Sequence, residues 1–390
     1  MSGALSGIRI VDLTTMISGP VATQMLADQG ADVIKVESPE GDTMRYLSGK
    51  ESVSPSFLSA NRNKRSVVLD IKREPGRRAL LKLIATADVL VENFRPGTAT
   101  RLGLSETAVR SIKPDIVFVS INGFGETGPY VHKRVYDPII QAASGIAAIQ
   151  ADRETGRPQL VQMIIADQIT SMTAAQAITA ALLARARSGE GQHVKLAMLD
   201  AMVSFLWVSA LGSLTLPPPE GGARRGPGRP ERLFETADGY ITTVAVSQAE
   251  WQGLCTALEK PEWLDDERFA TAAARNANDR LFSAEIQSVL RQRTSREWLA
   301  LLDQYDVPCA PVLGFEDLLK DPQIAENGII QECQHSEFGS FRQARPPALF
   351  SATPSAIRTH APSLGQHTRE VLSELGLSGE EIDALTRSGG

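Results

Sequence analysis

The sequence is poor in the residues that form disulfides and metal sites. Its 390 residues include three cysteines, Cys255, Cys309 and Cys333, and five histidines. The cysteines are far apart, and the sequence contains neither a CxxC nor an HExxH motif. We therefore predict no disulfide framework and no metal site.

Long apolar runs and an excess of positive charge are also missing. No stretch approaches the roughly 18 apolar residues that a membrane span needs, and the first residues lack the pattern of a signal peptide. The formal net charge of -6 argues against general nucleic-acid binding. With 42% apolar and 22% charged residues, the composition is typical of a globular protein. We expect a soluble cytoplasmic protein that binds neither membranes nor nucleic acids.

Short apolar runs alternate with amphipathic stretches over the first 125 residues. The expected strands cover residues 8–13, 32–37, 66–71, 88–94 and 115–122, and the expected helices cover residues 19–30, 74–87 and 105–114. Near-continuous apolar strands separated by helices are typical of a buried parallel sheet. This pattern predicts a doubly wound α/β core.

The second half of the chain changes character at a loop rich in proline, glycine and arginine, residues 216–232. Before it we expect a long helix over 168–189, a strand over 193–199 and a helix over 200–214. After it we expect a strand over 240–246 and helices over 250–258, 279–293 and 295–305. The pattern predicts a second, smaller α+β domain over residues 233–325.

Three glycines, Gly123, Gly125 and Gly128, have the GxGxxG spacing of a dinucleotide-binding turn and follow an expected strand. The rest of that motif is missing, because Pro129 follows and no strand ending in an acidic residue comes about 20 residues later. A flexible loop is the better interpretation. An NAD(P)-binding oxidoreductase remains an alternative.

Asp167 is the most suggestive ionisable residue. It follows an apolar run and precedes the long expected helix, which makes it a natural N-cap whose charge the helix dipole would stabilise. Such a carboxylate can also act as a nucleophile that forms an acyl intermediate. The residues alone leave both roles open.

Several strings, found in order along nearly the whole chain, resemble the class III CoA-transferases, a family that includes formyl-CoA transferases, carnitine CoA-transferases and 2-methylacyl-CoA racemases. They are GIRIVDLTTMISGP (7–20), GADVIKVESPEGD (30–42), NRNKRSVVLDIK (61–72), VENFRPG (91–97), INGFGETGPY (121–130), YDPIIQAASG (136–145), IADQITSM (165–172), RSGEGQHVKLAMLDA (187–201) and APSLGQHT (361–368).

The resemblance implies a reaction in which the Asp167 carboxylate attacks an acyl-CoA thioester. An aspartyl anhydride and an aspartyl-CoA thioester follow, so that CoA passes to a free carboxylic acid without a metal. Carried over position by position, the residues that contact coenzyme A or acyl-CoA are Ser18, Lys72, Asn93, Phe94, Arg95, Arg101, Arg134, Tyr136 and Asp137. The basic stretch Asn61 to Arg65 is either part of the same cationic wall or a solvated loop.

The resemblance also implies an assembly. A Rossmann-like large domain would be built from residues 1–215 and from 326–390, which return from the small domain, with 216–232 as the linker. Two chains would form an interlocked homodimer.

Departures from the family bear on the substrate. Formyl-CoA transferases have Gln at Ile17, Arg at Ser38 and a glycine-rich loop where this chain has residues 220–232, which weakens an oxalate and formate assignment. Racemases have a His base at the position of Tyr136. The pKa of a tyrosine is normally about 10, so Tyr136 is a poor base near pH 7, and a 2-methylacyl-CoA racemase is therefore only the alternative function. Arg224, Arg225 or Arg229 would bind a second carboxylate if the partner acid is a small dicarboxylate such as succinate or a C5 acid; otherwise they are solvated linker charges.

Overall fold

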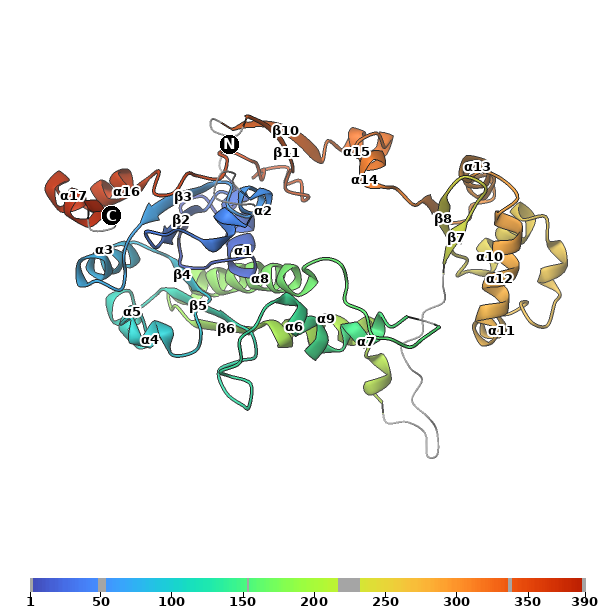
Figure 1. The fold of residues 1–390 in the computed structure, drawn as a ribbon, viewed down its shortest axis with the longest axis horizontal. Coiled ribbons are helices and arrows are strands. Elements are labelled where there is room, and N and C mark those ends of the chain that lie inside the picture. The colour runs from blue at the N-terminus through green and yellow to red at the C-terminus, as the bar shows by residue number, and fades with distance from the viewer. Residues whose placement is uncertain (1–2, 48–53, 153, 217–231, 336–338, 388–390) are drawn as a thin grey trace. The chain divides into compact units, whose positions relative to one another are not determined.

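A computed structural model describes residues 3–47, 54–152, 154–216, 232–335 and 339–387. The chain divides into two compact units, Met1–Gly222 together with Ile329–Gly390, and Ala223–Gly328. Both are traced along the sequence in Figure 1. Each unit is considered by itself.

The first unit contains a six-stranded sheet in which every neighbouring pair is parallel. The order along the sheet is β3-β2-β1-β4-β5-β6, the order of the Rossmann fold. The strands are β1 (Arg9–Asp12), β2 (Asp32–Glu37), β3 (Lys64–Val68), β4 (Val89–Glu92), β5 (Val117–Asn122) and β6 (His193–Ala197). The predicted α/β class with a parallel sheet is confirmed.

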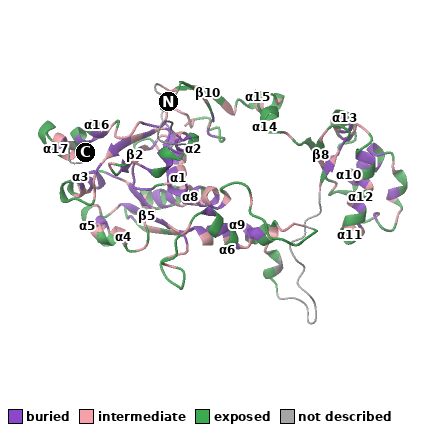
Figure 2. Cartoon of the chain, viewed as in Figure 1, coloured by how far each residue is buried: buried purple, intermediate pink, exposed green. Residues whose placement is uncertain are grey.

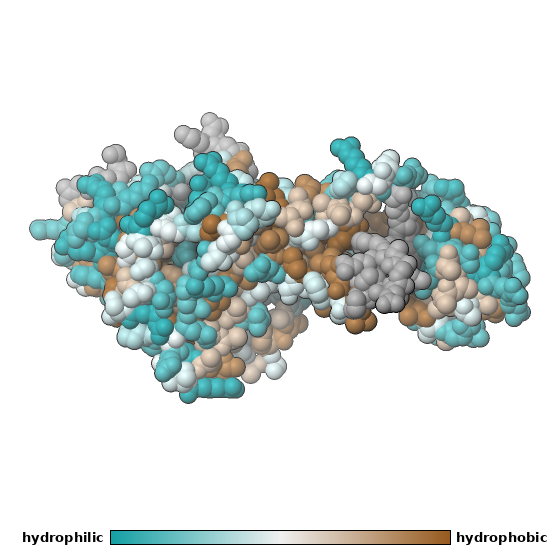
Figure 3. All heavy atoms as spheres, turned by 90° about the horizontal axis from the view of Figure 1, so that it is seen from below, coloured by the Kyte–Doolittle hydropathy of each residue, from teal (hydrophilic) through white to brown (hydrophobic). Residues whose placement is uncertain are grey.

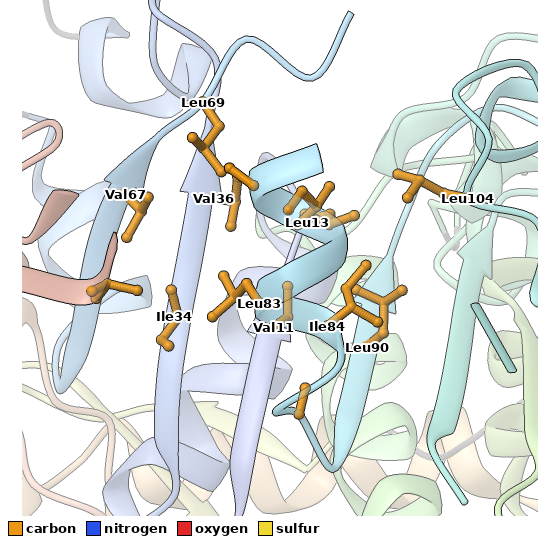
Figure 4. Packing of buried hydrophobic residues seen from close by; sticks show 14 of the residues in the cluster. Val11, Leu13, Ile34, Val36, Val67, Leu69, Leu83, Ile84, Leu90 and Leu104 are labelled. Atoms are coloured by element: carbon orange, nitrogen blue, oxygen red, sulfur yellow. The ribbon is translucent and has the colours of Figure 1, made fainter. Parts of the chain in front are cut away.

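Helices cover both faces of this sheet. On one face, α3 (Glu74–Ile84), α5 (Glu106–Ile112) and α16 (Thr368–Glu374) pack on residues such as Val11 and Ile34. Figure 4 shows this packing. On the other face, α1 (Ser18–Asp28) and α8 (Ile165–Ser188) pack on the alternate residues, among them Ile10 and Val33. Buried strands between exposed helix faces are visible in Figure 2, as expected when successive side chains point to opposite faces.

The first unit also contains several short elements and a hairpin outside the sheet. They are η1 (Thr43–Tyr46), α2 (Pro55–Ala60), α4 (Thr98–Arg101), α6 (Asp137–Ser144), α7 (Ile146–Ile149), α9 (Met198–Ser209), η2 (Gly212–Leu214), the hairpin β10 (Ile330–His335) and β11 (Gly339–Ala344), and α17 (Gly379–Arg387). Many boundaries differ from prediction by a few residues, and two of these differences lie on the long helix and the strand after it. The long helix begins at Ile165 instead of residue 168, and the strand predicted to reach residue 199 ends at Ala197 because α9 begins there.

The second unit has a small antiparallel sheet, β7 (Leu233–Glu235), β8 (Tyr240–Thr243) and β9 (Cys309–Pro311). Its core is aromatic and includes Trp251, Trp263 and Trp298. The helices are α10 (Gln248–Ala257), η3 (Pro261–Leu264), α11 (Ala272–Ala277), α12 (Asp279–Leu290), α13 (Ser295–Gln304), α14 (Phe315–Leu318) and α15 (Pro322–Asn327). Among the helices described in either unit, none has the length and apolar character to span a bilayer.

Candidate functional site

A cavity of about 250 Å³ lies where β1, β4 and β5 end. The strand order reverses between β1 and β4, so the chains leaving these strands diverge and leave a crevice, the usual place for ligands in open α/β sheets. Seven of the residues predicted to belong to the site line this cavity: Ser18, Asn93, Phe94, Arg95, Arg134, Tyr136 and Asp167.

Asp167 lies in the first turn of α8, and the prediction that it caps this helix is wrong. The helix begins three residues earlier than predicted, so its N-cap position falls on Ile164, which has no polar side chain. The cap comes from another helix. The Asp137 carboxylate, in the first turn of α6, accepts hydrogen bonds from the backbone N–H groups of Ala166 and Asp167 at 2.7 and 3.0 Å.

The Asp167 side chain is free for another contact and accepts a hydrogen bond from the Ser18 hydroxyl. Ser18 is buried and is the first residue of α1, so the amino ends of α1 and α8 both face one carboxylate. Burial raises the pKa of Asp167, and the nearby Asp137 charge raises it further, while hydrogen bonds from Ser18 oppose the shift. Once ionised, a carboxylate whose pKa is raised is a stronger base than an ordinary aspartate, and it is also a stronger nucleophile toward an acyl carbon.

Cationic and aromatic groups border the rest of the cavity. Arg95 follows β4, and Lys133 and Arg134 lie in the segment between β5 and α6; all three are exposed. The Lys133 ammonium lies 3.7 Å from the centroid of the Tyr130 ring. Tyr136 is 65% exposed. These groups can bind a ligand that has both a phosphate and a planar aromatic ring, because guanidinium groups pair with phosphate and stack on planar groups.

Asn93 has contacts that sequence reasoning missed. Its side-chain amide accepts from Thr15 N–H at 3.0 Å and donates to Thr15 C=O at 2.8 Å, which joins the chain leaving β4 to the chain leaving β1. The neighbouring Phe94 N–H donates to the buried Glu92 carboxylate at 2.7 Å. An asparagine directly after an apolar strand was the only sequence signal for this link.

Three other predicted residues lie outside the set that lines the cavity. Lys72 and Arg101 are exposed, and the Arg101 guanidinium donates to the Thr98 hydroxyl. Asp137 is 3% exposed and lies behind the cavity, where it caps α8. Arg224, Arg225 and Arg229 lie outside the described residues.

The stretch Asn61 to Arg65 fits neither of the two predicted alternatives. Arg62 is buried against Asp28, and Lys64 is buried against Asp12. Arg65 pairs with Asp32 and Glu374. These cations serve internal ion pairs, whose acidic partners are distant in sequence and could not be paired from it.

The GxGxxG glycines belong to an irregular segment. The next helix after Gly128 is α6, which begins only at Asp137. Gly125 and Gly128 have φ angles of 95° and 89°, which favour glycine, and a Cβ on Gly123 would come within 2.5 Å of the Val135 side chain. Turn geometry and close packing explain the spacing. The described residues contain no group of three or more potential metal ligands.

Comparisons with known proteins agree over nearly the whole chain. A family model described as CoA-transferase family III matches residues 5–368. Formyl-CoA:oxalate CoA-transferases from Escherichia coli O6:H1 and Shigella sonnei are each 35% identical to this chain over 415 residues, covering 100% of it and 99% of the relative.

Solved structures give the same result. A CAIB/BAIF family protein from Brucella suis has a TM-score of 0.83 and 32% identity, over 96% of this chain and 100% of that chain. Rv3272 from M. tuberculosis, in its orthorhombic form, also has a TM-score of 0.83, with 31% identity over 94% and 98% of the two chains.

Proposed function

Since the chain belongs to CoA-transferase family III, we propose that it moves CoA from an acyl-CoA thioester to a free carboxylic acid, with Asp167 as the nucleophile. The observation that carries this proposal is the Asp167 carboxylate itself. It is partly buried at the end of a cavity bordered by cations, and it faces the amino end of α1.

In the first half of the proposed reaction, an Asp167 oxygen attacks the thioester carbonyl carbon and the C–S bond breaks. The products are an acyl-aspartyl anhydride and CoA thiolate. The thiolate then attacks the aspartyl carbonyl, which releases the donor's carboxylate and leaves an aspartyl-CoA thioester. Each step exchanges one activated acyl group for another, so the reaction needs no ATP and no metal.

In the second half, the acceptor carboxylate attacks the aspartyl carbonyl of the thioester and displaces CoA thiolate. A second anhydride forms, now with the acceptor's acyl group. Attack of the thiolate on that acyl carbonyl gives the new acyl-CoA and regenerates the Asp167 carboxylate.

Ser18 is proposed to stabilise the oxyanions of these steps. Its backbone and hydroxyl both hydrogen-bond the Asp167 carboxylate, so they also face the aspartyl oxygen when that carbon becomes tetrahedral. One aligned donor of this kind contributes about 10²- to 10³-fold in rate. The positive end of α1 adds to the same field.

Coenzyme A is the proposed nucleotide ligand. Arg95 and Arg134 would pair with its phosphates and Phe94 would contact its apolar portions, because these side chains border the cavity that contains Asp167. Lys72 and Arg101, exposed outside the cavity, would meet the outer end of the ligand.

The proposed acceptor differs from the oxalate in the relatives' names. Ile17, where formyl-CoA transferases have Gln, is 7% exposed and packs with Met44 and Phe57. It offers no polar group to a very small diacid. We therefore propose a larger acid such as succinate or a C5 acid, with Arg224, Arg225 or Arg229 as candidates for its second carboxylate.

The protein is also proposed to act as an interlocked homodimer. A groove of about 1460 Å³ in the first unit is lined mainly by apolar side chains, with Val21 and Met25 on α1, Met172 and Leu183 on α8, and Phe350. Met172 is 61% exposed and Leu183 is 54% exposed. Apolar residues such as Phe205 and Val208 are exposed on α9 as well. On the face of the molecule that Figure 3 draws, hydrophobic residues are exposed among polar ones. Patches of this extent on one chain are typical of subunit interfaces.

A matrix of acyl-CoA donors and carboxylate acceptors, read by mass spectrometry, tests the proposed function. Transfer of CoA between at least one pair supports it, and the pair identifies the substrates. Exchange of the α-hydrogen of a 2-methylacyl-CoA with deuterium in the absence of an acceptor identifies a racemase instead. Saturable NAD(H) binding without CoA binding identifies the oxidoreductase alternative.

A further inference from the structure

Two lysines lie within the sheet itself, in positions where a charge is costly. Lys35 is in the middle of β2 and Lys64 begins β3, and both ammonium groups are fully buried. Lys35 pairs with Asp42 at 2.9 Å and Lys64 pairs with Asp12 at 3.0 Å, with both carboxylates also buried. Apolar replacements of such pairs are often neutral or stabilising, so stability alone does not account for them.

Three of the four buried groups, Lys35, Asp42 and Asp12, contact the turn between β1 and α1, residues 13–17, and Lys64 holds Asp12. Lys35 Nζ donates to the Thr14 carbonyl at 2.8 Å, and Asp42 Oδ1 accepts from Met16 N–H at 3.3 Å. Asp12 Oδ1 accepts from Thr14 N–H at 2.9 Å. Burial alone would raise the pKa of Asp12, but Lys64 and Lys35 hold it well below its usual range.

The turn needs this support because its backbone is strained. Met16 has a φ of 68°, a left-handed conformation that costs a residue with a side chain about 1–2 kcal/mol. Thr15 is fixed from the other side by the amide of Asn93. Two residues beyond Met16 the chain reaches Ser18, whose hydroxyl donates to Asp167.

We propose that Lys35 and Asp42 are positioning residues: their buried pair fixes Thr14 and Met16 so that the Ser18 hydroxyl and amide face Asp167. This inference rests on the proposed function. Neither residue touches substrate. Their effect passes through the backbone of the turn, and a displacement of the Ser18 donors by about 1 Å costs roughly 10²-fold in rate.

The test is the double variant Lys35→Met with Asp42→Asn. It removes both charges together, so no unpaired charge is left buried, and it breaks the bond to the Thr14 carbonyl. The expected result is a fall in kcat of roughly 10- to 100-fold with little change in KM for acyl-CoA. The acid limb of the pH–rate profile should move to higher pH, because Asp167 loses the Ser18 hydrogen bond that lowers its pKa.

The pH shift isolates the Ser18 contact. The other charged groups around Asp167 are Asp137 on α6, Arg95 after β4, and Lys133 and Arg134 before α6. None of them is changed in the double variant.

The matched control is Arg185→Met with Asp88→Asn. This pair joins helix α8 to the start of β4, with Arg185 Nη2 2.7 Å from Asp88 Oδ1, and it lies in the last turn of α8 and just before β4, away from the turn. The control should lower Tm while kcat and the acid limb stay at wild-type values.

Three results would overturn the inference. The first is a double variant with wild-type kcat and an unmoved acid limb. The second applies if the double variant does not fold. Asp42→Asn alone keeps one acceptor oxygen for the Met16 N–H and loses the oxygen that pairs with Lys35, so it should move the acid limb less far in the same direction. An unmoved acid limb in this variant contradicts the proposal. The third is equal amide hydrogen exchange in the double variant and the control. This measurement is needed if the wild type transfers CoA between no tested substrates, because the proposed function itself has then failed. Amide hydrogen exchange at Thr15 and Met16 then decides: faster exchange in the double variant than in the control supports the positioning role, and equal exchange rejects it.

Discussion

At the residue scale, the proposed chemistry depends on one carboxylate with two opposing neighbours. The Ser18 hydroxyl donates to Asp167 and lowers its pKa, and the charge of Asp137 raises it. The proposed reaction needs ionised Asp167, so activity should fall as pH decreases through a pKa that is raised above the 3.8 of an ordinary aspartate.

Replacing Asp167 itself should abolish transfer. We expect Asp167→Asn to lower kcat by at least about 10³-fold, because the amide cannot form the anhydride. Steady-state transfer assays measure this, with circular dichroism to confirm the fold. The matched control is Asp200→Asn, since Asp200 is also in the first turn of a helix and is exposed. Equal activity in the two variants would contradict the nucleophile assignment.

Removing the Ser18 hydroxyl should change the pH dependence in a defined direction. In Ser18→Ala, Asp167 loses a donor, its pKa rises, and the acid limb of kcat/KM moves to higher pH. Ser18→Thr retains a hydroxyl, so the acid limb of kcat/KM should lie at its wild-type pH. A shift of the Ala variant to lower pH is incompatible with the hydrogen bond described.

The sequence singled out Asp167 and left two roles open, a helix cap and a nucleophile, and the cap role is wrong. An acidic residue before a run of small helical residues indicates a cap, and a start three residues earlier changes a cap into a first-turn residue. Lys35 is a second signal in the sequence, because a cation inside the otherwise apolar strand β2 indicates a buried acidic partner. Which acid it meets depends on strand order, which the sequence does not show.

At the scale of elements, α6 and α8 are coupled through the Asp137 carboxylate. Asp137 accepts the amides of Ala166 and Asp167 and also the Gln141 side-chain amide at 2.6 Å. The first turn of α8 therefore depends on a residue about 30 positions away in sequence. Only the packing of the two helices brings this cap into place.

Two substitutions of Asp137 should separate its charge from its hydrogen bonds. Asp137→Leu leaves the α8 amides without an acceptor and should lower the free energy of unfolding by about 1–2 kcal/mol. Asp137→Asn keeps an acceptor, so its stability should be closer to wild type. Denaturant unfolding measures both.

The same asparagine variant should also move the acid limb to lower pH, since it removes the charge that raises the pKa of Asp167. That direction is opposite to the one expected for Ser18→Ala. If the acid limbs of Asp137→Asn and Ser18→Ala moved in the same direction, the opposing effects of Asp137 and Ser18 on the pKa of Asp167 would be contradicted.

The elements of the parallel sheet were predictable because apolar runs with helical stretches between them repeat along the chain. The hairpin β10–β11 was not predicted. Its strands are polar and largely exposed, as in Gln331, Glu332 and Arg342, and so lack the alternation that marks a half-buried strand.

At the scale of the whole molecule, the apolar groove between α1 and α8 predicts a dimer. Native mass spectrometry of the full chain should give twice the chain mass. Leu183→Glu, in the groove, should weaken the dimer and lower activity with it, whereas Leu281→Glu, at an exposed position of the second unit, should not. A folded, fully active monomer at assay concentration would contradict the dimer proposal.

The most direct test of the central claim is to trap the covalent intermediate. Wild-type protein is incubated with an acyl-CoA that the transfer matrix identifies, quenched in acid and digested with trypsin. The account predicts a CoA adduct on the peptide of residues 154–185, assigned to Asp167 by fragmentation and absent from Asp167→Asn. An adduct on any other residue, or transfer by Asp167→Asn at the wild-type rate, would contradict it.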